Sequence, residues 1–184
     1  MKVRKLIAMA FAVAGFTTGI AAFAQTSQSV NATATVTTPI TGAATATLAF
    51  GTVTKGQANV IAATVASAGA FNFSGDESDN ITVAVPADAT ISTTSGSGAD
   101  MTVTLDRAGL LANSTDNVQA DGVVSDASSG TVTVALSADA DGDGVGSDGL
   151  GQTYFWIGGS VTPTATQQRG AYTGTFSVVA SYSN

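Results

Sequence analysis

Acidic residues recur at alternate positions in one glycine-rich segment, which runs from Asp139 to Gly149. Carboxylate oxygens spaced in this way around a glycine bend can converge on a hard cation, for which calcium is the natural candidate. The candidate ligands are Asp139, Asp141, Asp143 and Asp148. An EF-hand loop closes with a bidentate Glu where this chain has Leu150, and no helical pattern flanks the segment. Two interpretations remain: a calcium site in a loop between strands, or a solvated hairpin connection, because tight turns also favour Asp and Gly.

The rest of the chain offers little catalytic chemistry. It contains no His and no Cys, so neither a Ser/His/Asp nor a Cys/His nucleophile can be assembled. A second acidic group, between Gly75 and Asp79, could supply an acid and a base to a glycosidic bond, but a polar turn after a strand explains it fully. No glycine run has the context of a phosphate-binding loop. We therefore expect no enzymatic activity and no cofactor beyond calcium.

The amino terminus has the organisation of a secretory signal peptide. Three basic residues within the first five positions precede an apolar run from Leu6 to Ala22, and small residues stand before Gln25. An uncleaved membrane anchor is the weaker alternative, because Thr17 and Thr18 interrupt a run already short of the about 20 apolar residues that a bilayer span needs. The sequence predicts export, cleavage after residue 24 and no membrane insertion of the mature chain.

Loss of this leader makes the chain strongly acidic. Residues 25–184 retain three basic and all thirteen acidic residues, a net charge of −10. Nucleic acid and anionic membrane surfaces are therefore not expected as partners. The 160 residues that remain suit one domain. Since the chain has no Cys, packing and backbone pairing must stabilise that domain without disulfides, although an exported protein could form them.

Composition and periodicity predict an all-β fold, with a β-sandwich as the architecture. Thr, Ala, Ser, Val and Gly dominate, and long helical periodicity is missing after the leader. Short strands with regular turn signals are typical of sandwiches. The expected strands are Val30–Thr38, Thr45–Phe50, Asn59–Ala66, Ala70–Ser74, Ile81–Val85, Met101–Arg107, Thr131–Ser137, Thr153–Val161 and Ala171–Tyr182. We divide the chain into a signal peptide (1–24), an N-terminal extension or first strand (25–40) and the sandwich domain (41–184).

Both ends of the mature chain alternate apolar and polar residues. The last expected strand places Tyr172, Phe176, Val178, Ala180 and Tyr182 on one face. Near the amino terminus, Val30, Ala32, Ala34 and Val36 form a similar row. The first row fits a donor strand that completes the sheet of a neighbouring copy, and it equally fits the first strand of a self-contained sandwich. The last row fits an assembly strand or a simply buried strand.

Aromatic residues concentrate at one place, Tyr154–Ile157. Rings on a strand can stack against sugars, but burial is the favoured interpretation. Because Tyr154 and Trp156 face one side and Phe155 and Ile157 the other, this strand should be central or covered, with Trp156 anchoring the core.

Four short motifs occur in order along the chain. They are Leu48-Ala49-Phe50-Gly51, Phe71-Asn72-Phe73-Ser74-Gly75, Gly158-Gly159 and the closing Gly170-Ala171-Tyr172-Thr173-Gly174-Thr175-Phe176 with the terminal Tyr182. In this set the chain resembles the bacterial secreted family "domain of unknown function 4402", and it is more distantly similar to chaperone-usher pilins. Pilins often carry a disulfide and a penultimate Tyr, whereas this chain has no Cys and two residues follow Tyr182.

The resemblance implies an immunoglobulin-like β-sandwich that serves as a structural subunit of a bacterial surface fibre, a fimbria or pilus, with a role in cell adhesion. It implies copies of the chain or related pilus subunits as partners, with a periplasmic chaperone and an outer-membrane usher for assembly. The apolar row that ends at Tyr182 would face the chaperone and the core. The protein would pass through the periplasm to the cell surface. The alternative function is a self-complete secreted β-sandwich that binds calcium and carbohydrate.

Overall fold

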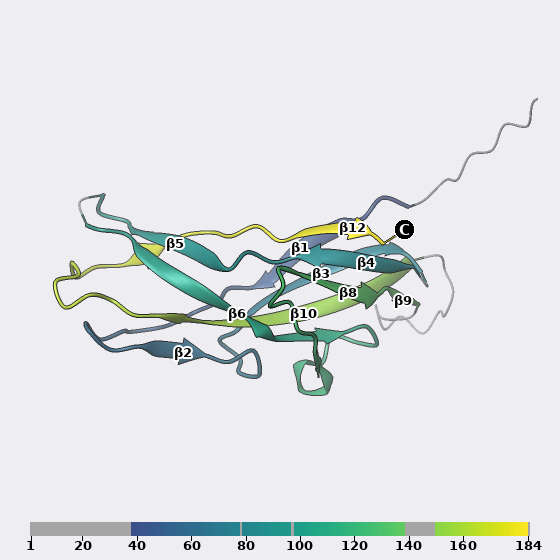
Figure 1. The fold of residues 1–184 in the computed structure, drawn as a ribbon, viewed down its shortest axis with the longest axis horizontal. Coiled ribbons are helices and arrows are strands. Elements are labelled where there is room, and N and C mark those ends of the chain that lie inside the picture. Colours follow the sequence, from purple (N-terminus) through teal and green to yellow (C-terminus); the bar gives the residue numbers. More distant parts are fainter. Residues whose placement is uncertain (1–37, 78, 97, 139–149, 184) are drawn as a thin grey trace, which may run out of the picture. The chain divides into compact units, whose positions relative to one another are not determined.

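A computed structural model of the chain describes residues 38–138 and 150–183, except Ser78 and Ser97. Every described residue belongs to one compact unit, residues 36–184. These residues form antiparallel strands and one 3-10 turn, with no α-helix among them, which confirms the all-β prediction (Figure 1). The elements are β1 (Thr41–Ala46), β2 (Asn59–Ile61), β3 (Gly69–Asp76), β4 (Asn80–Ala84), β5 (Asp88–Thr93), β6 (Met101–Asn113), η1 (Gln119–Asp121), β7 (Val123–Val124), β8 (Thr131–Ala135), β9 (Ser137–Ala138), β10 (Leu150–Val161), β11 (Tyr172–Thr173) and β12 (Val179–Tyr182).

The strands form two sheets. The larger sheet has the order β1-β3-β10-β6-β5-β11, with β2 and β9 also paired to β10 and β7 paired to β6. The smaller sheet has the order β12-β4-β8. β10 organises the larger sheet, because its twelve residues pair with β3 on one side and with β6 on the other.

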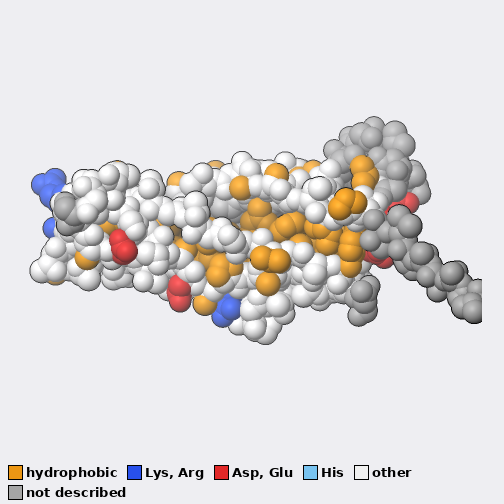
Figure 2. Space-filling model, turned by 90° about the horizontal axis from the view of Figure 1, so that it is seen from above, with side chains coloured by type: hydrophobic (Ala, Val, Ile, Leu, Met, Phe, Trp, Pro, Cys, Tyr) orange, Lys and Arg blue, Asp and Glu red, His pale blue; other side chains and the backbone are white. Residues whose placement is uncertain are grey.

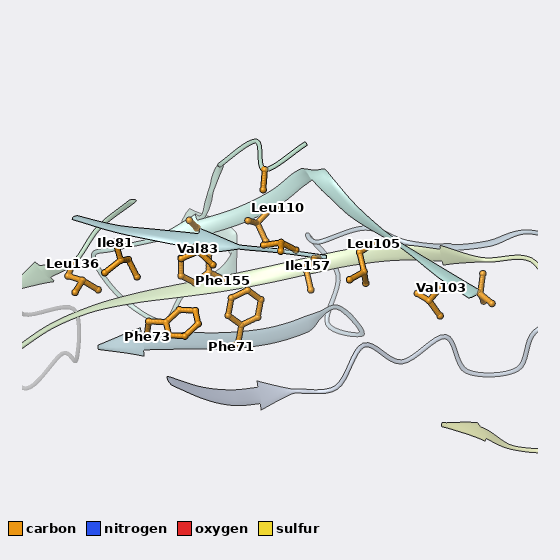
Figure 3. Close-up of a cluster of buried hydrophobic side chains, with 14 of the residues drawn as sticks. Phe71, Phe73, Ile81, Val83, Val103, Leu105, Leu110, Leu136, Phe155 and Ile157 are labelled. Carbon is orange, nitrogen blue, oxygen red and sulfur yellow. The ribbon is translucent and has the colours of Figure 1, made fainter. Parts of the chain in front are cut away.

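Side chains from both sheets meet in one hydrophobic core. β3 contributes Phe71 and Phe73, β4 contributes Ile81 and Val83, and β10 contributes Phe155, which is fully buried (Figure 3). The rings of Phe71 and Phe155 stack with centroids 5.1 Å apart, and Phe73 meets Phe155 edge to face at 6.1 Å. Burial of an aromatic side chain of this size contributes about 1.5–3 kcal/mol, so this trio is a main source of cohesion in a domain without disulfides.

The opposite face of β10 is covered by a smaller apolar cluster. Trp156, only 7% exposed, packs there with Ala63, Ala68 and Leu111, and Tyr154 borders them. The prediction that this strand is central and covered on both faces is therefore confirmed. Phe155 rather than Trp156 anchors the main core, because the tryptophan points to the other side of the sheet. Burial of Trp156 also removes it as a platform for stacking a sugar.

Several predicted strands differ from the structure. The strand expected over Asn59–Ala66 ends at Ile61 as β2, and the one expected over Met101–Arg107 continues to Asn113 as β6. The strand expected over Thr45–Phe50 is β1, which lies earlier, and residues 47–50 leave the ladder after an irregularity between Ala44 and Ala46. The strand expected over Ala171–Tyr182 is divided, since β11 pairs with β5 of the larger sheet and β12 with β4 of the smaller one. Residues 174–178 pass between the sheets and belong to neither ladder. β5 and β7 were not predicted.

Candidate functional site: an open apolar groove

A groove of about 1470 Å³ separates the first described segment from the last one. One wall is β1 with residues 47–55, and the other is the segment 167–178. Its floor includes Phe71, Phe73 and Ile91. Figure 2 shows apolar side chains gathered along a hollow on this face of the molecule. Because the floor belongs to the main core, the groove exposes part of the surface that a closed domain would bury.

The β1 wall is exposed along its whole length, although one of its faces is turned toward the core. All six residues of β1 are solvent-exposed, and β1 pairs with β3 along one edge only. Gly42 and Ala44 stand opposite Phe73 and Phe71, whose rings point into the core. A Cβ on Gly42 would approach the Phe73 ring to 2.6 Å, which places this position on the core-facing side. The groove is thus open directly above the core face of β1.

The second wall carries the apolar row predicted from the sequence. The side chains that pack from this wall and from β12 against the main core, each partly buried, are Tyr172, Phe176, Val178, Ala180 and Tyr182. Val179, on the alternate face, is 62% exposed. Gly174 lets the wall approach β5 closely, since a Cβ there would overlap the carbonyl oxygen of Thr90.

Two tyrosine hydroxyls hold the ends of this last segment. At its start, the hydroxyl of Tyr172 donates to the carbonyl of Gln168 (2.9 Å) and accepts from the side-chain amide of buried Gln167 (2.9 Å). At its end, the hydroxyl of Tyr182 donates to the carbonyl of Thr38 (2.6 Å) and accepts from the backbone N–H of Asp76 (2.8 Å). The middle of the segment lies between these two fixed points.

The motif residues of the sequence surround this arrangement. A Cβ on Gly75 would lie 2.5 Å from the Tyr182 hydroxyl, so glycine makes room for that ring. Leu48 packs over Gly69 and Gly159, where a Cβ would meet its atoms at 3.2 and 3.3 Å. Gly158 allows β2 to approach β10, because a Cβ there would overlap the carbonyl oxygen of Ile61. Several motif positions are thus small so that backbone and large side chains can meet.

The charged groups near the groove lie at its two ends. Lys55 and Arg169 line one end. Asp76 lies at the other, where its carboxylate accepts a hydrogen bond from the backbone N–H of Thr38 (2.9 Å). This hydrogen bond gives one member of the acidic group between Gly75 and Asp79 a structural role. Elsewhere, hydrogen bonds from the Ser128 hydroxyl and backbone N–H lower the pKa of Asp126, an exposed residue between β7 and β8.

Two predicted sets of site residues lie outside the described residues. They are the calcium candidates Asp139, Asp141, Asp143 and Asp148, and the donor row Val30, Ala32, Ala34 and Val36. On either side of the acidic segment, Ala138 pairs with Gly151 in a β9–β10 ladder. In the described part of the chain, no three acidic side chains are grouped closely enough to hold a metal ion.

Sequence reasoning missed two parts of the groove. It did not identify β5, which supplies Ala89 and Ile91, and it treated residues 51–55 as a connection. For residues 51–55, the sequence feature that could have indicated a buried wall was the run of apolar residues Leu48, Phe50 and Val53, all of which pack against the main core.

Fold and groove together define a class of protein, an all-β domain whose core lies open between its first and last described segments. The chain belongs to the family described as "Domain of unknown function (DUF4402)", whose model matches residues 22–182. No curated protein matches the chain. None of the described residues forms a helix with the length and apolar character that crossing a membrane requires.

Proposed function

We propose that the protein is a structural subunit of a bacterial surface fibre, assembled by β-strand addition. The observation that supports this most directly is the apolar groove beside the last segment, with two walls that leave the ladders at residues 47–55 and 174–178. An extended segment laid between such walls gains main-chain hydrogen bonds from them, and its alternate side chains fill the groove. In this proposal the protein is not an enzyme.

The order of the strands supports an immunoglobulin-like sandwich that lacks one strand. In that fold, one sheet has the order A-B-E-D, and the other has F between C and the final strand G. β1-β3-β10-β6 follows the first order, and β12-β4 corresponds to F-C. β12 is the edge of its sheet among the described residues, so the position of G beside it is open to an added strand.

The proposed donor is the N-terminal segment of another copy or of a related subunit. Its row of Val30, Ala32, Ala34 and Val36 would face the groove floor, while the Asn and Thr side chains between them face solvent. Before assembly, a periplasmic chaperone would cover the groove, and an outer-membrane usher would exchange the chaperone for the donor. Without such cover, the apolar side chains that line the open groove would favour aggregation.

The test compares unheated and boiled samples of the cell-surface protein by electrophoresis in detergent. We expect a ladder that collapses to monomer on boiling, because strand exchange produces kinetically stable assemblies. Deletion of residues 25–37 should abolish the ladder and leave Thr38 to form its bonds with Asp76 and Tyr182. The deleted chain should then bind the same segment as a peptide, and a scrambled peptide is the control. A deletion variant that still forms the ladder would contradict the proposal.

A second candidate function, calcium binding, is favoured by the alternate carboxylates of residues 139–148. Pairing of Ala138 with Gly151 brings the two flanks of that segment together, as a loop site between strands requires. In this candidate function the domain is self-complete, and no ladder forms in unheated detergent.

A further inference from the structure

We infer that opposite charges at the two ends of the groove make copies of the chain join in one direction, with the Asp76 end of one copy against the Lys55 and Arg169 end of the next. This inference rests on the proposed function and adds an interface and a direction to it.

The basic end contains two of the three basic residues that follow the leader. Lys55 and Arg169 are both exposed and both line the groove. The adjacent backbone is held by a hydrogen bond from the N–H of Gly56 to the carbonyl of Pro163 (2.8 Å). Asp100 lies near this end, beside Gln167, so the end keeps a single excess positive charge.

The acidic end lies where β3 pairs with the start of β10. Asp76 stands opposite Leu150 in that ladder, and Glu77 and Asp79 follow in the chain, giving three negative charges. At the other end of β10, Val161 pairs with Asn59, which follows Lys55 closely in the chain. Since eleven residue steps of a strand cover about 36 Å, the acidic and basic ends are separated by roughly the length of β10. Figure 2 shows basic side chains at one end of this face and acidic side chains at the opposite end, with further acidic side chains between them.

The donor segment leaves the domain at the acidic end. Thr38 is bonded to Asp76 and Tyr182, and one residue separates it from Val36, the last apolar residue of the donor row. Two extended residues span only about 7 Å. When Val36 of one copy lies at the end of a neighbouring groove, the donor's Asp76 therefore lies within about 10 Å of that end. This is about the Debye length at 0.1 M salt, so the charges at the junction interact.

The two walls run in opposite directions along the groove. Residues 47–55 run toward the basic end, and the segment 169–178 runs from it toward Tyr182. A strand inserted antiparallel to residues 174–178 emerges at the basic end, where the donor's acidic end meets Lys55 and Arg169 of the acceptor. The reverse insertion would bring two acidic ends together, which like-charge repulsion disfavours. The charges therefore select insertion antiparallel to residues 174–178.

Cross-linking tests this direction in the full chain, which contains no native Cys. With a short bismaleimide, the double variant Lys55→Cys/Asp79→Cys should give a ladder that survives boiling, whereas each single variant should not. Asp121, exposed and remote from the groove lining, provides the matched control Lys55→Cys/Asp121→Cys, which should stay monomeric after boiling.

The outcomes separate the inference from the function it rests on. A boiling-resistant dimer with Asp79→Cys alone would mean that two acidic ends meet, and would overturn the proposed direction. An unheated ladder without any cross-linked product in the double variant would overturn the proposed interface and leave strand addition in place. Absence of the unheated ladder would overturn both.

Charge reversal provides an independent measurement. Lys55→Glu/Arg169→Glu should slow assembly of chain diluted from denaturant by about tenfold at low salt, because oppositely charged surfaces accelerate association. High salt should remove the difference. The third cation, Arg107, lies outside the groove lining, and Arg107→Glu is the control. Addition of Asp79→Lys to the slowed variant should restore much of the rate, and an unchanged rate in the double reversal would contradict the inference.

Discussion

The hydroxyl oxygen of Tyr182 lies 2.6 Å from the carbonyl oxygen of Thr38, a residue 144 positions earlier in the chain. The same hydroxyl accepts the backbone N–H of Asp76, whose carboxylate binds the N–H of Thr38. These three bonds tie the beginning of the described chain to its end, and they connect β12 with β3 across the two sheets. Tyr182, which the sequence suggested as part of an assembly surface, therefore also has a structural role within the domain.

Tyr182→Phe removes the hydroxyl and leaves two partly buried backbone groups without this partner. We expect a loss of about 1–3 kcal/mol in the free energy of unfolding, measured by urea denaturation. Ser181→Ala, at an exposed neighbouring position, is the matched control and should leave the stability unchanged. A Tyr182→Phe variant as stable as the unmodified chain would mean that water replaces the hydroxyl without loss.

Gly174→Ala places a methyl group against the carbonyl oxygen of Thr90 in β5. Because backbone atoms must shift to accept it, we expect destabilisation of about 1–3 kcal/mol, seen as a lower midpoint in thermal unfolding. Ser177→Ala, on an exposed part of the same wall, should not change the midpoint. Equal midpoints for the two variants would show that this wall does not need the close approach.

Ala44→Trp should obstruct the groove, because Ala44 pairs with Phe71 and shares its core-facing side. We expect a folded monomer that no longer forms the detergent-resistant ladder. Thr45→Trp puts the same side chain on the alternate face of β1 and should assemble normally. Retention of the ladder by Ala44→Trp, in a variant with an unchanged circular dichroism spectrum, would argue against insertion beside β1.

Removal of calcium tests the acidic segment directly. If residues 139–148 bind the ion, a chelator should lower the melting temperature, and Asp141→Ala/Asp143→Ala should abolish that sensitivity. Asp88→Ala/Asp106→Ala removes two carboxylates from elsewhere in the chain and should keep the sensitivity. A melting curve that is the same with and without chelator would contradict calcium binding by this segment.

Burial could be predicted from the sequence wherever the pattern of apolar and polar side chains along a strand identifies its buried faces. β10 carries apolar residues on both faces at Tyr154–Ile157, and this pattern requires cover on both sides. The structure has that cover, with the main core under Phe155 and the smaller cluster around Trp156. The row ending at Tyr182 was visible for the same reason, because alternation identifies which face is buried.

Backbone partners could not be predicted in this way. Alternation continues unchanged from Tyr172 to Tyr182, yet the chain leaves one sheet and joins the other between these residues. Hydrogen-bonding partners leave no mark on side-chain polarity, so the division into β11 and β12 was invisible. β5 was missed because only Ala89 and Ile91 are apolar in a strand otherwise made of Asp, Ser and Thr. The groove therefore could not be foreseen, since it depends on where both walls leave their ladders.

The bonds at Thr38 have a mechanical consequence. A pulling force on the residues before Thr38 would reach the larger sheet through Asp76 and the smaller sheet through Tyr182 at the same time. Neither sheet would carry the tension alone, and the first strand could not be peeled from β3 until both connections had broken. A load applied to the chain before Thr38 would therefore be divided between the two sheets.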